Sequence, residues 1–218
     1  SEEVSNIMDK YGLVVLPVVD TIGRLVGRIT IDDVVDIIRE EAGKDYQLAS
    51  GITEDVEASD SVWLLTRARI PWLLIGLIGG IVGSRVIGGF ESYLGRFPHL
   101  AFFMPLIGAM GGNVGIQSSA IVVQSLASGA KDLETSFSRW IKEISVALLN
   151  ASVLGLIIFG YNQLIGSEMA LTYTVTLALF SVVIFASLFG TLIPLVLNRI
   201  KIDPAVATGP FITTLNDI

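Results

Sequence analysis

The sequence contains no cysteine and only one histidine, His99. Without cysteine it can form neither a disulfide nor a thiolate metal site, and one histidine cannot build a histidine metal centre. Charged residues are also scarce, at 16% of the 218 residues, whereas 52% are hydrophobic and the mean hydropathy is +0.70. Soluble domains average about 25% charged residues, so the composition predicts an integral membrane protein.

The acidic residues are concentrated near the N-terminus. Residues 1–66 hold 14 of the 21 acidic residues and 5 of the 14 basic residues, a net charge of −9, whereas the rest of the chain carries +2. We therefore expect an acidic soluble head followed by a nearly neutral body that faces lipid.

Long apolar stretches divide this body into membrane spans, because a helix needs about 20 apolar residues to cross the hydrocarbon core. Complete spans are predicted over residues 70–90, 100–127, 142–165 and 171–197. A fifth span is expected over residues 203–218. It should be incomplete, since about 15 residues rise only about 22 Å as a helix, which is too short to cross the hydrocarbon core. The predicted fold class is mainly α: a polytopic membrane bundle of five helices per subunit with a small α/β segment at the N-terminus.

Basic residues flank these spans unevenly. If the acidic head is inside, seven of them flank the inner ends and two, Arg85 and Arg96, flank the outer ends. Cytoplasmic loops collect Lys and Arg. The predicted localisation is therefore the cell membrane, with several spans and a cytoplasmic N-terminus.

Polar residues interrupt the second predicted span, where Gly112, Asn113 and Gln117 lie close together. Amides deep in hydrocarbon are costly unless they are hydrogen-bonded or hydrated. They therefore either line an ion path or bond to another helix, and both alternatives stay open. Glycines four residues apart, such as Gly76 and Gly80, predict close packing between helices.

The last segment carries the clearest chemical signal. Asp217 lies 14 residues beyond Asp203, about 21 Å along a continuous helix, which predicts a carboxylate well inside the bilayer. An intramembrane carboxylate is a functional candidate by default. The alternative is a structural salt bridge with Arg85, the only base in the interior of a predicted span.

Oxygen ligands favour magnesium, calcium or manganese over zinc or copper. One aspartate cannot neutralise a divalent cation, whereas two copies about a two-fold axis supply two carboxylates and a pore on that axis. Magnesium keeps several waters and binds through one or two carboxylates. A homodimer with hydrated magnesium at Asp217, and with Asn113 and Gln117 bonding its water shell, matches this requirement.

Several short motifs resemble the MgtE family of magnesium transporters. They are Gly111-Gly112-Asn113-Val114-Gly115-Ile116-Gln117, Gly89-Phe90-Glu91, Asp203-Pro204-Ala205 and Thr213-Thr214-Leu215-Asn216-Asp217. The resemblance implies a homodimeric magnesium channel with five spans per subunit. It also implies a pore lined by the second and fifth spans, with a central ion at Asp217 and with Gly112, Asn113, Gln117, Asn216 and Asp203 along the path.

The head is expected to fold as helix, strand, strand and helix, an order similar to the later part of a cystathionine-β-synthase (CBS) motif. The predicted domains are a partial CBS motif over residues 1–48, a connecting plug helix over 49–69 and a pore domain over 70–218. The plug helix rests on the resemblance. A plain interfacial helix anchored by Trp63 and Trp72 is the alternative.

Two kinds of ligand are considered for the head. Thr30 and Asp33 lie in a segment that resembles the CBS nucleotide signature, which makes ATP a candidate ligand. Asp36, Glu41 and Asp45 match the family's sensor acids, so the resemblance implies a regulatory magnesium site, although Lys44 stands where relatives have another acid. Otherwise the acidic run is a solvated face.

The predicted function is magnesium transport through a homodimeric channel gated by cytosolic magnesium. The alternative is a proton- or ion-coupled secondary transporter of another divalent cation, which would also use an intramembrane aspartate and broken glycine-rich helices. We expect no enzyme activity, because an aspartyl protease needs two intramembrane aspartates and the four complete spans contain none. No nucleic-acid partner is expected.

Overall fold

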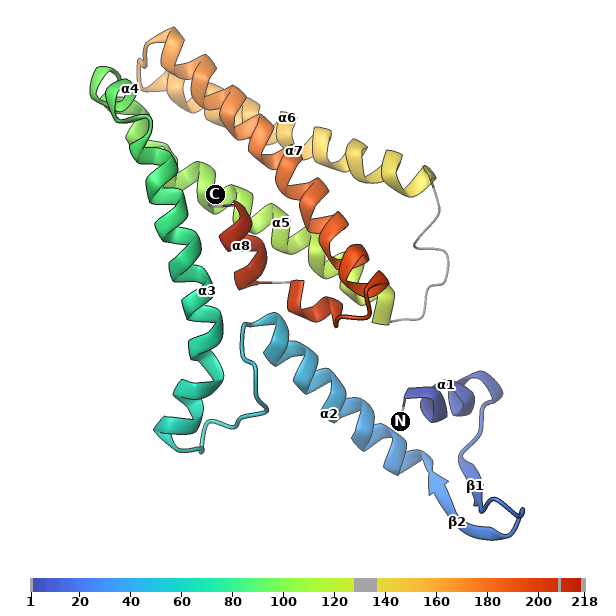
Figure 1. The fold of residues 1–218 in the computed structure, drawn as a ribbon. Coiled ribbons are helices and arrows are strands. Elements are labelled where there is room, and N and C mark those ends of the chain that lie inside the picture. The colour runs from blue at the N-terminus through green and yellow to red at the C-terminus, as the bar shows by residue number, and fades with distance from the viewer. Residues whose placement is uncertain (1, 128–136, 208, 217–218) are drawn as a thin grey trace. The chain divides into compact units, whose positions relative to one another are not determined.

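The computed structural model describes residues 2–127, 137–207 and 209–216, which divide into two compact units between Gln47 and Leu48. The fold is mainly helical with one two-stranded sheet, as the sequence predicts (Figure 1). Each unit is built differently, so we describe them one at a time.

The first unit has the predicted order of helix, strand, strand and helix. It contains α1 (Glu2–Tyr11), β1 (Val15–Val19), β2 (Leu25–Thr30) and most of α2 (Ile31–Ala49). The strands pair antiparallel, with Val15 opposite Thr30. Met8 and Val34 are almost fully buried and form its small core.

Tight turns join these elements. Asp20 Oδ1 accepts hydrogen bonds from the backbone N–H groups of Ile22, at 3.0 Å, and Arg24, at 2.8 Å. An aspartate that bonds the backbone just ahead of it stabilises a turn between two strands. At the end of α1, Gly12 has a φ of +60°, a left-handed conformation that suits glycine and ends the helix.

The second unit is built from long apolar helices. They are α3 (Val62–Gly88), α5 (Met104–Ala127), α6 (Phe137–Leu164) and α7 (Met169–Arg199), with α4 (Glu91–Arg96) and η1 (Pro98–Phe102) linking α3 to α5. Four segments are long and apolar enough to cross a membrane: Val62–Gly88, Pro98–Ala127, Trp140–Leu164 and Met169–Arg199. The four complete spans predicted from the sequence are therefore confirmed as helices.

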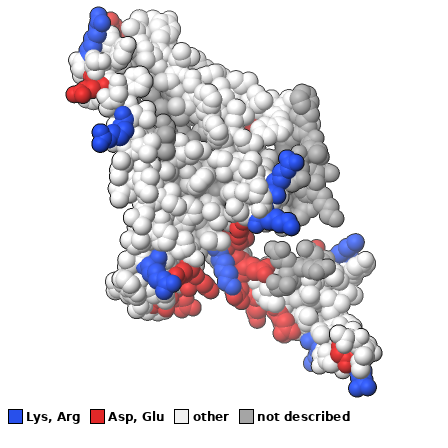
Figure 2. All heavy atoms as spheres, in the orientation of Figure 1, with Lys and Arg blue, Asp and Glu red and all other residues white. Residues whose placement is uncertain are grey.

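Helix α7 packs against both α5 and α6, and buried apolar side chains from all three form the core. Representative members are Val114, Ala151, Val175, Leu179 and Val183. On the face of this unit seen in Figure 2, charged side chains are almost absent from the broad middle. Such a surface suits contact with lipid rather than water.

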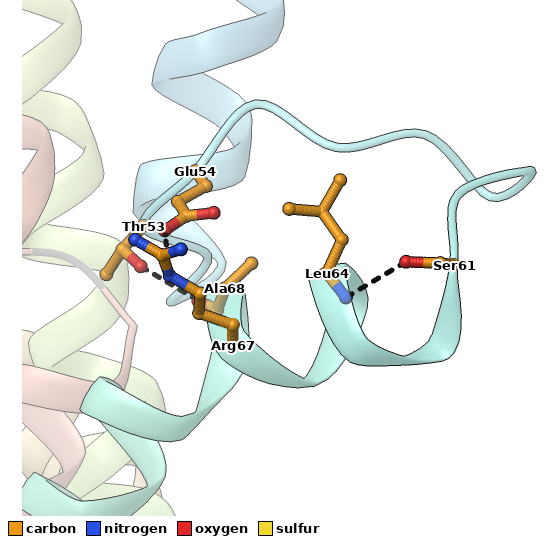
Figure 3. Close-up of polar contacts among 6 residues, drawn as sticks. All are labelled: Thr53, Glu54, Ser61, Leu64, Arg67 and Ala68. Carbon is orange, nitrogen blue, oxygen red and sulfur yellow. Dashed lines mark hydrogen bonds and ion pairs between the residues drawn. The ribbon is translucent and has the colours of Figure 1, made fainter.

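The segment between α2 and α3 differs from the predicted plug helix. Residues 50–61 are not helical, and α3 begins at Val62 and runs without a break past residue 69. Two residues set these limits. Gly51 has a φ of +79°, and the Ser61 side chain caps α3 by accepting from the Leu64 N–H at 3.3 Å (Figure 3). The connecting role of residues 49–69 stays a prediction.

The alternative interpretation of this segment is an interfacial helix anchored by Trp63 and Trp72, and these two side chains differ in burial. Trp63 is 76% exposed, whereas Trp72 is 7% exposed and packs inside the unit. Trp72 therefore does not have the surface position of an interfacial anchor. Of the two tryptophans, Trp63 has the exposed position that an interfacial anchor needs.

The loop before α3 is attached to the helix that follows it (Figure 3). The Thr53 backbone N–H and hydroxyl both donate to the Ala68 carbonyl, at 2.9 and 3.0 Å, and Glu54 pairs with Arg67 at 3.0 Å. Pro71 lies inside α3 nearby, and a proline removes one backbone donor and disturbs the local helix ladder. Thr53 thus donates two hydrogen bonds to the Ala68 carbonyl, close to the place where Pro71 disturbs the helix.

The expected helix from Asp203 onward is not continuous. A short 3-10 helix, η3 (Pro204–Ala207), precedes α8 (Pro210–Asn216), and Gly209 between them has a φ of +57°. A positive φ breaks a right-handed helix, and a residue before proline is also disfavoured in the helical region. The depth of about 21 Å estimated for Asp217 assumed an unbroken helix, and this assumption is wrong, so the depth of Asp217 stays a prediction. Asp217 itself lies outside the described residues.

Candidate ion pathway along α5 and α8

Helix α8 packs against both α3 and α5. Two consecutive threonines on α8 lie on glycines of these helices. A Cβ atom on Gly112 of α5 would lie 3.3 Å from Thr213 Cγ2, and one on Gly79 of α3 would overlap Thr214 Cγ2. Glycine lets helix backbones approach closely, so these contacts fix the position of α8 between the two spans (Figure 1).

The predicted pore residues on α5 lie on two sides of that helix. Gly112 is buried under Thr213, whereas Asn113 and Gln117 are exposed in the single chain. Residues four apart lie on one helix face, so the two amides form one polar stripe on an apolar span. We call Asn113 and Gln117 the amide face of α5. Amides on a lipid-spanning helix require water or a polar partner.

Three pore residues are predicted in the last segment, and the structure describes the side chain of only one of them, Asp203. Asp203 is exposed, and its Oδ1 accepts the Ala205 backbone N–H at 2.8 Å, so it caps η3. Asn216 is the last residue of α8, and its side chain, like all of Asp217, is outside the description. The structure therefore gives Asp203 a local capping role and places the backbone that leads to Asp217 beside α5.

The predicted sensor acids are not brought together by α2 alone. Glu41 and Asp45 are one turn apart, whereas Asp36 precedes Glu41 by five residues, about 140° around the helix. The described parts of the chain contain no group of three or more His, Asp or Glu side chains placed to hold a metal ion. A divalent site at these acids requires ligands from another element or another chain.

Lys44 and Glu40 form an ion pair within this acidic run. Lys44 Nζ is 2.5 Å from Glu40 Oε1, one turn away on α2. The hydrogen bond and the charge of Lys44 lower the pKa of Glu40 below its ordinary value. Lys44 therefore offsets part of the repulsion among the acids of this helix.

Thr30 and Asp33, the candidate nucleotide contacts, form the N-terminal cap of α2. Asp33 Oδ2 accepts the Thr30 backbone N–H at 2.9 Å and the Thr30 hydroxyl at 2.7 Å. These two hydrogen bonds lower the pKa of Asp33. The observed interaction is thus a local one in which the third helical residue bonds back to the cap.

Sequence reasoning missed a carboxylate within the second unit. Glu143 Oε1, on α6, accepts the Ser187 hydroxyl of α7 at 2.6 Å and the Ser118 hydroxyl of α5 at 3.1 Å. The third predicted span included Glu143, but only as a residue at its edge. The serines at positions 118 and 187 within charge-free spans were the signal for a bond between helices.

Comparison with known proteins agrees with these features. The sequence profile of a family described as "MgtE: Divalent cation transporter" matches residues 104–218, just over half of the chain. The chain belongs to the MgtE family. The match includes α5, α6, α7 and α8, so the amide face and the Glu143 contacts both lie within the family's characteristic region.

Curated relatives of the family align along the whole chain. "Magnesium transporter MgtE" of Thermus thermophilus is 37% identical over 222 residues, that of Enterococcus faecalis 34% over 218, and that of Bacillus subtilis 33% over 217. Each alignment covers 100% of this chain and 48% of the relative. The chain therefore spans about half the length of the curated relatives it matches. The MgtE resemblance drawn from the short motifs is confirmed.

Proposed function

We propose that this chain forms half of a homodimeric magnesium channel whose ion path follows the amide face of α5 and continues to Asp217. The exposure of Asn113 and Gln117 on a span without charged residues carries the proposal. These amides need a hydrated surface, and α8 is packed against the same helix by Thr213 and Gly112. The naming of the MgtE relatives as magnesium transporters supports magnesium as the ion.

The chemistry of the path suits a hydrated divalent cation. Amide oxygens and amide N–H groups can bond the water shell of magnesium, which gives up its water reluctantly. One Asp217 per chain supplies one negative charge, so a two-fold axis provides the two that neutralise the ion. The fifth span of each subunit would include α8 (Pro210–Asn216). The protein is then a multi-pass cell-membrane protein with a cytoplasmic N-terminus.

Gating is proposed to pass from the head to α8 through α2. Helix α2 continues into the second unit, where the carbonyl oxygen of Ala49 lies against Gly209, just before α8. Magnesium bound by Asp36, Glu41 and Asp45 together with acids of a partner's partial CBS motif would hold α2 in one position. Because Thr30 and Asp33 are occupied in the cap of α2, nucleotide binding is not part of the proposal.

Magnesium flux into liposomes tests the pore. We expect Asp217→Ala in the full-length protein to abolish selective magnesium entry, and Asn113→Ala with Gln117→Ala to reduce it, without loss of the dimer. Ser181→Ala is a matched control, because its hydroxyl bonds only the Leu177 carbonyl of its own helix. Unchanged selective flux in Asp217→Ala would reject the pore, and flux that requires a proton gradient would favour a coupled transporter.

A second measurement tests the sensor. Neutralising Asp36, Glu41 and Asp45 together should leave the channel open at high internal magnesium, since the three acids proposed to bind the ion no longer favour the closed state. The matched control is Asp32→Asn with Glu40→Gln, which removes charge from the same helix without touching the three acids. Normal closure of the triple variant would reject these residues as the sensor.

A further inference from the structure

Glu143 connects three helices through one carboxylate oxygen. Ser187 of α7 donates to Oε1 at 2.6 Å, Ser118 of α5 donates to it at 3.1 Å, and the two serine oxygens are 3.1 Å apart. Ser118 and Ser187 are 9% and 2% exposed. We call Glu143, Ser118 and Ser187 the carboxylate clamp.

The two helices that face Glu143 carry few charges, whereas α6 itself carries Arg139 four residues before it and Lys142 beside it in the chain. The α5 sequence contains no charged residue, and that of α7 contains only Arg199 at its end. Among the described side chains, no base lies within 4 Å of the Glu143 carboxylate. Hydroxyl donors to a carboxylate make short, strong hydrogen bonds, and a low dielectric strengthens them further. Loss of either serine hydroxyl removes one of the two hydrogen-bond donors from a partly buried carboxylate oxygen.

A second contact fixes the same side of α5. A Cβ atom on Gly190 of α7 would overlap the carbonyl oxygen of Gly115 on α5. Gly115 and Ser118 are three residues apart and therefore lie on one face. A rotation of α5 about its axis would separate Ser118 from Glu143 and would drive this glycine contact into a clash or a gap.

We propose that Glu143 is a positioning residue that sets the rotation of α5 and so keeps the amide face directed at the ion path. Ser118 immediately follows Gln117 in the chain, about 100° around the helix, so holding Ser118 against α6 and α7 turns Gln117 and Asn113 away from them. The inference rests on the proposed function, because the amide face matters only if ions pass along it.

Thiol labelling tests this rotation directly. Residues 1–218 contain no cysteine, so Asn113→Cys, Gln117→Cys and Val114→Cys, made singly in full-length protein in liposomes, each add one thiol to this region. The rate of reaction with a membrane-impermeant methanethiosulfonate reports contact with water. We expect fast labelling at positions 113 and 117 and slow labelling at position 114, whose native side chain is 7% exposed.

Changes at the clamp should alter this pattern in a specific order. Glu143→Ala and Ser187→Ala should reduce the ratio of the rate at 117 to that at 114 by about tenfold, the scale of one charge-assisted hydrogen bond. Glu143→Gln keeps an oxygen acceptor for both serines and should retain the original ratio. Ser145→Ala on α6 is the matched control, because its hydroxyl bonds only the Ile141 carbonyl.

The outcomes separate this inference from the proposed function. Labelling that is fast at 113 and 117 but unchanged by Glu143→Ala and Ser187→Ala rejects the clamp and leaves the ion path standing. No labelling at 113 and 117 in otherwise native protein rejects the ion path and the inference together. If Glu143→Ala fails to fold, Ser187→Ala decides, since it retains the carboxylate and removes only its shortest hydrogen bond.

Discussion

The two units of this protein differ in the sequence separation of the contacts that stabilise each unit internally. In residues 2–47, the side-chain hydrogen bonds of the Asp20 turn and the Thr30–Asp33 cap join residues two to four positions apart. In the second unit, Ser118 and Glu143 are 25 positions apart, and Glu143 and Ser187 are 44 apart. Local contacts shape the head, whereas distant contacts between glycines and hydroxyls determine how the apolar helices fit.

The largest expected effect is at the close approach of α5 and α7. Gly190→Ala places a methyl group against the backbone oxygen of Gly115, and backbone cannot move aside as a side chain can. We expect destabilisation of about 3 kcal/mol, at the upper end for overpacking, measured by thermal unfolding in detergent.

Gly160→Ala is the control for that substitution, because a Cβ atom at Gly160 of α6 meets nothing within 4 Å. Alanine at such a site should be neutral or stabilising by up to about 1 kcal/mol, given its higher helix propensity. Equal effects of the two substitutions would show that helix propensity, and not distant packing, dominates in this unit.

A smaller effect is expected where α8 meets α3. Gly79→Ala should cost about 1–2 kcal/mol and lower magnesium flux, since the new methyl displaces Thr214 Cγ2. Thr214→Ser removes that methyl group, so the double variant should recover both stability and flux. Gly80→Ala, one residue away with open space around its Cβ, should change neither quantity.

The loop before α3 provides an intermediate case between local and distant contacts. Thr53→Val keeps the backbone bond to Ala68 but removes the hydroxyl bond, and we expect a loss of about 1 kcal/mol. Hydrogen exchange of residues 50–61 measures this loss as faster opening of the loop. Thr66→Val is the matched control, because the Thr66 hydroxyl bonds only Val62 within its own helix.

The smallest effect concerns the cap of α2 and depends on pH. Hydrogen bonds from Thr30 lower the pKa of Asp33 in the folded protein, so this carboxylate stabilises the cap at pH values above the ordinary aspartate pKa of about 3.9. The stabilisation is lost as the pH falls through the lowered folded pKa. Hydrogen exchange at residues 31–34, corrected for intrinsic rates, should show faster opening in Asp33→Ala than in the native chain at pH 6.

That difference between Asp33→Ala and the native chain should vanish as the pH approaches the folded pKa of Asp33. Asp32→Ala, beside it, is the matched control and should leave the exchange at both pH values close to that of the native chain. A difference that persists unchanged in acid would mean that Asp33 acts through packing and not through its charge.

Much of the fold was predictable because its signals are local. The apolar runs predicted the four complete spans within a few residues, except that α3 begins at Val62 instead of residue 70. The order of helix, strand, strand and helix in the head was predictable from its β-branched runs and from Gly12, which ends α1. The break at Gly209 was missed although the Gly209-Pro210 pair is a local helix-breaking signal, whereas the close approach of the Ala49 carbonyl to Gly209 could not be predicted from the sequence.

The sequence by itself determined that this chain is a membrane protein of the MgtE family, because apolar length and short polar motifs are properties of contiguous residues. Only the tertiary structure decided that Thr213 and Thr214 lie on Gly112 and Gly79, and that Glu143 bonds Ser118 and Ser187. Those pairs join separate helices whose relative rotation no single segment specifies. The direction of the amide face therefore depends on how α5 packs as well as on which residues it carries.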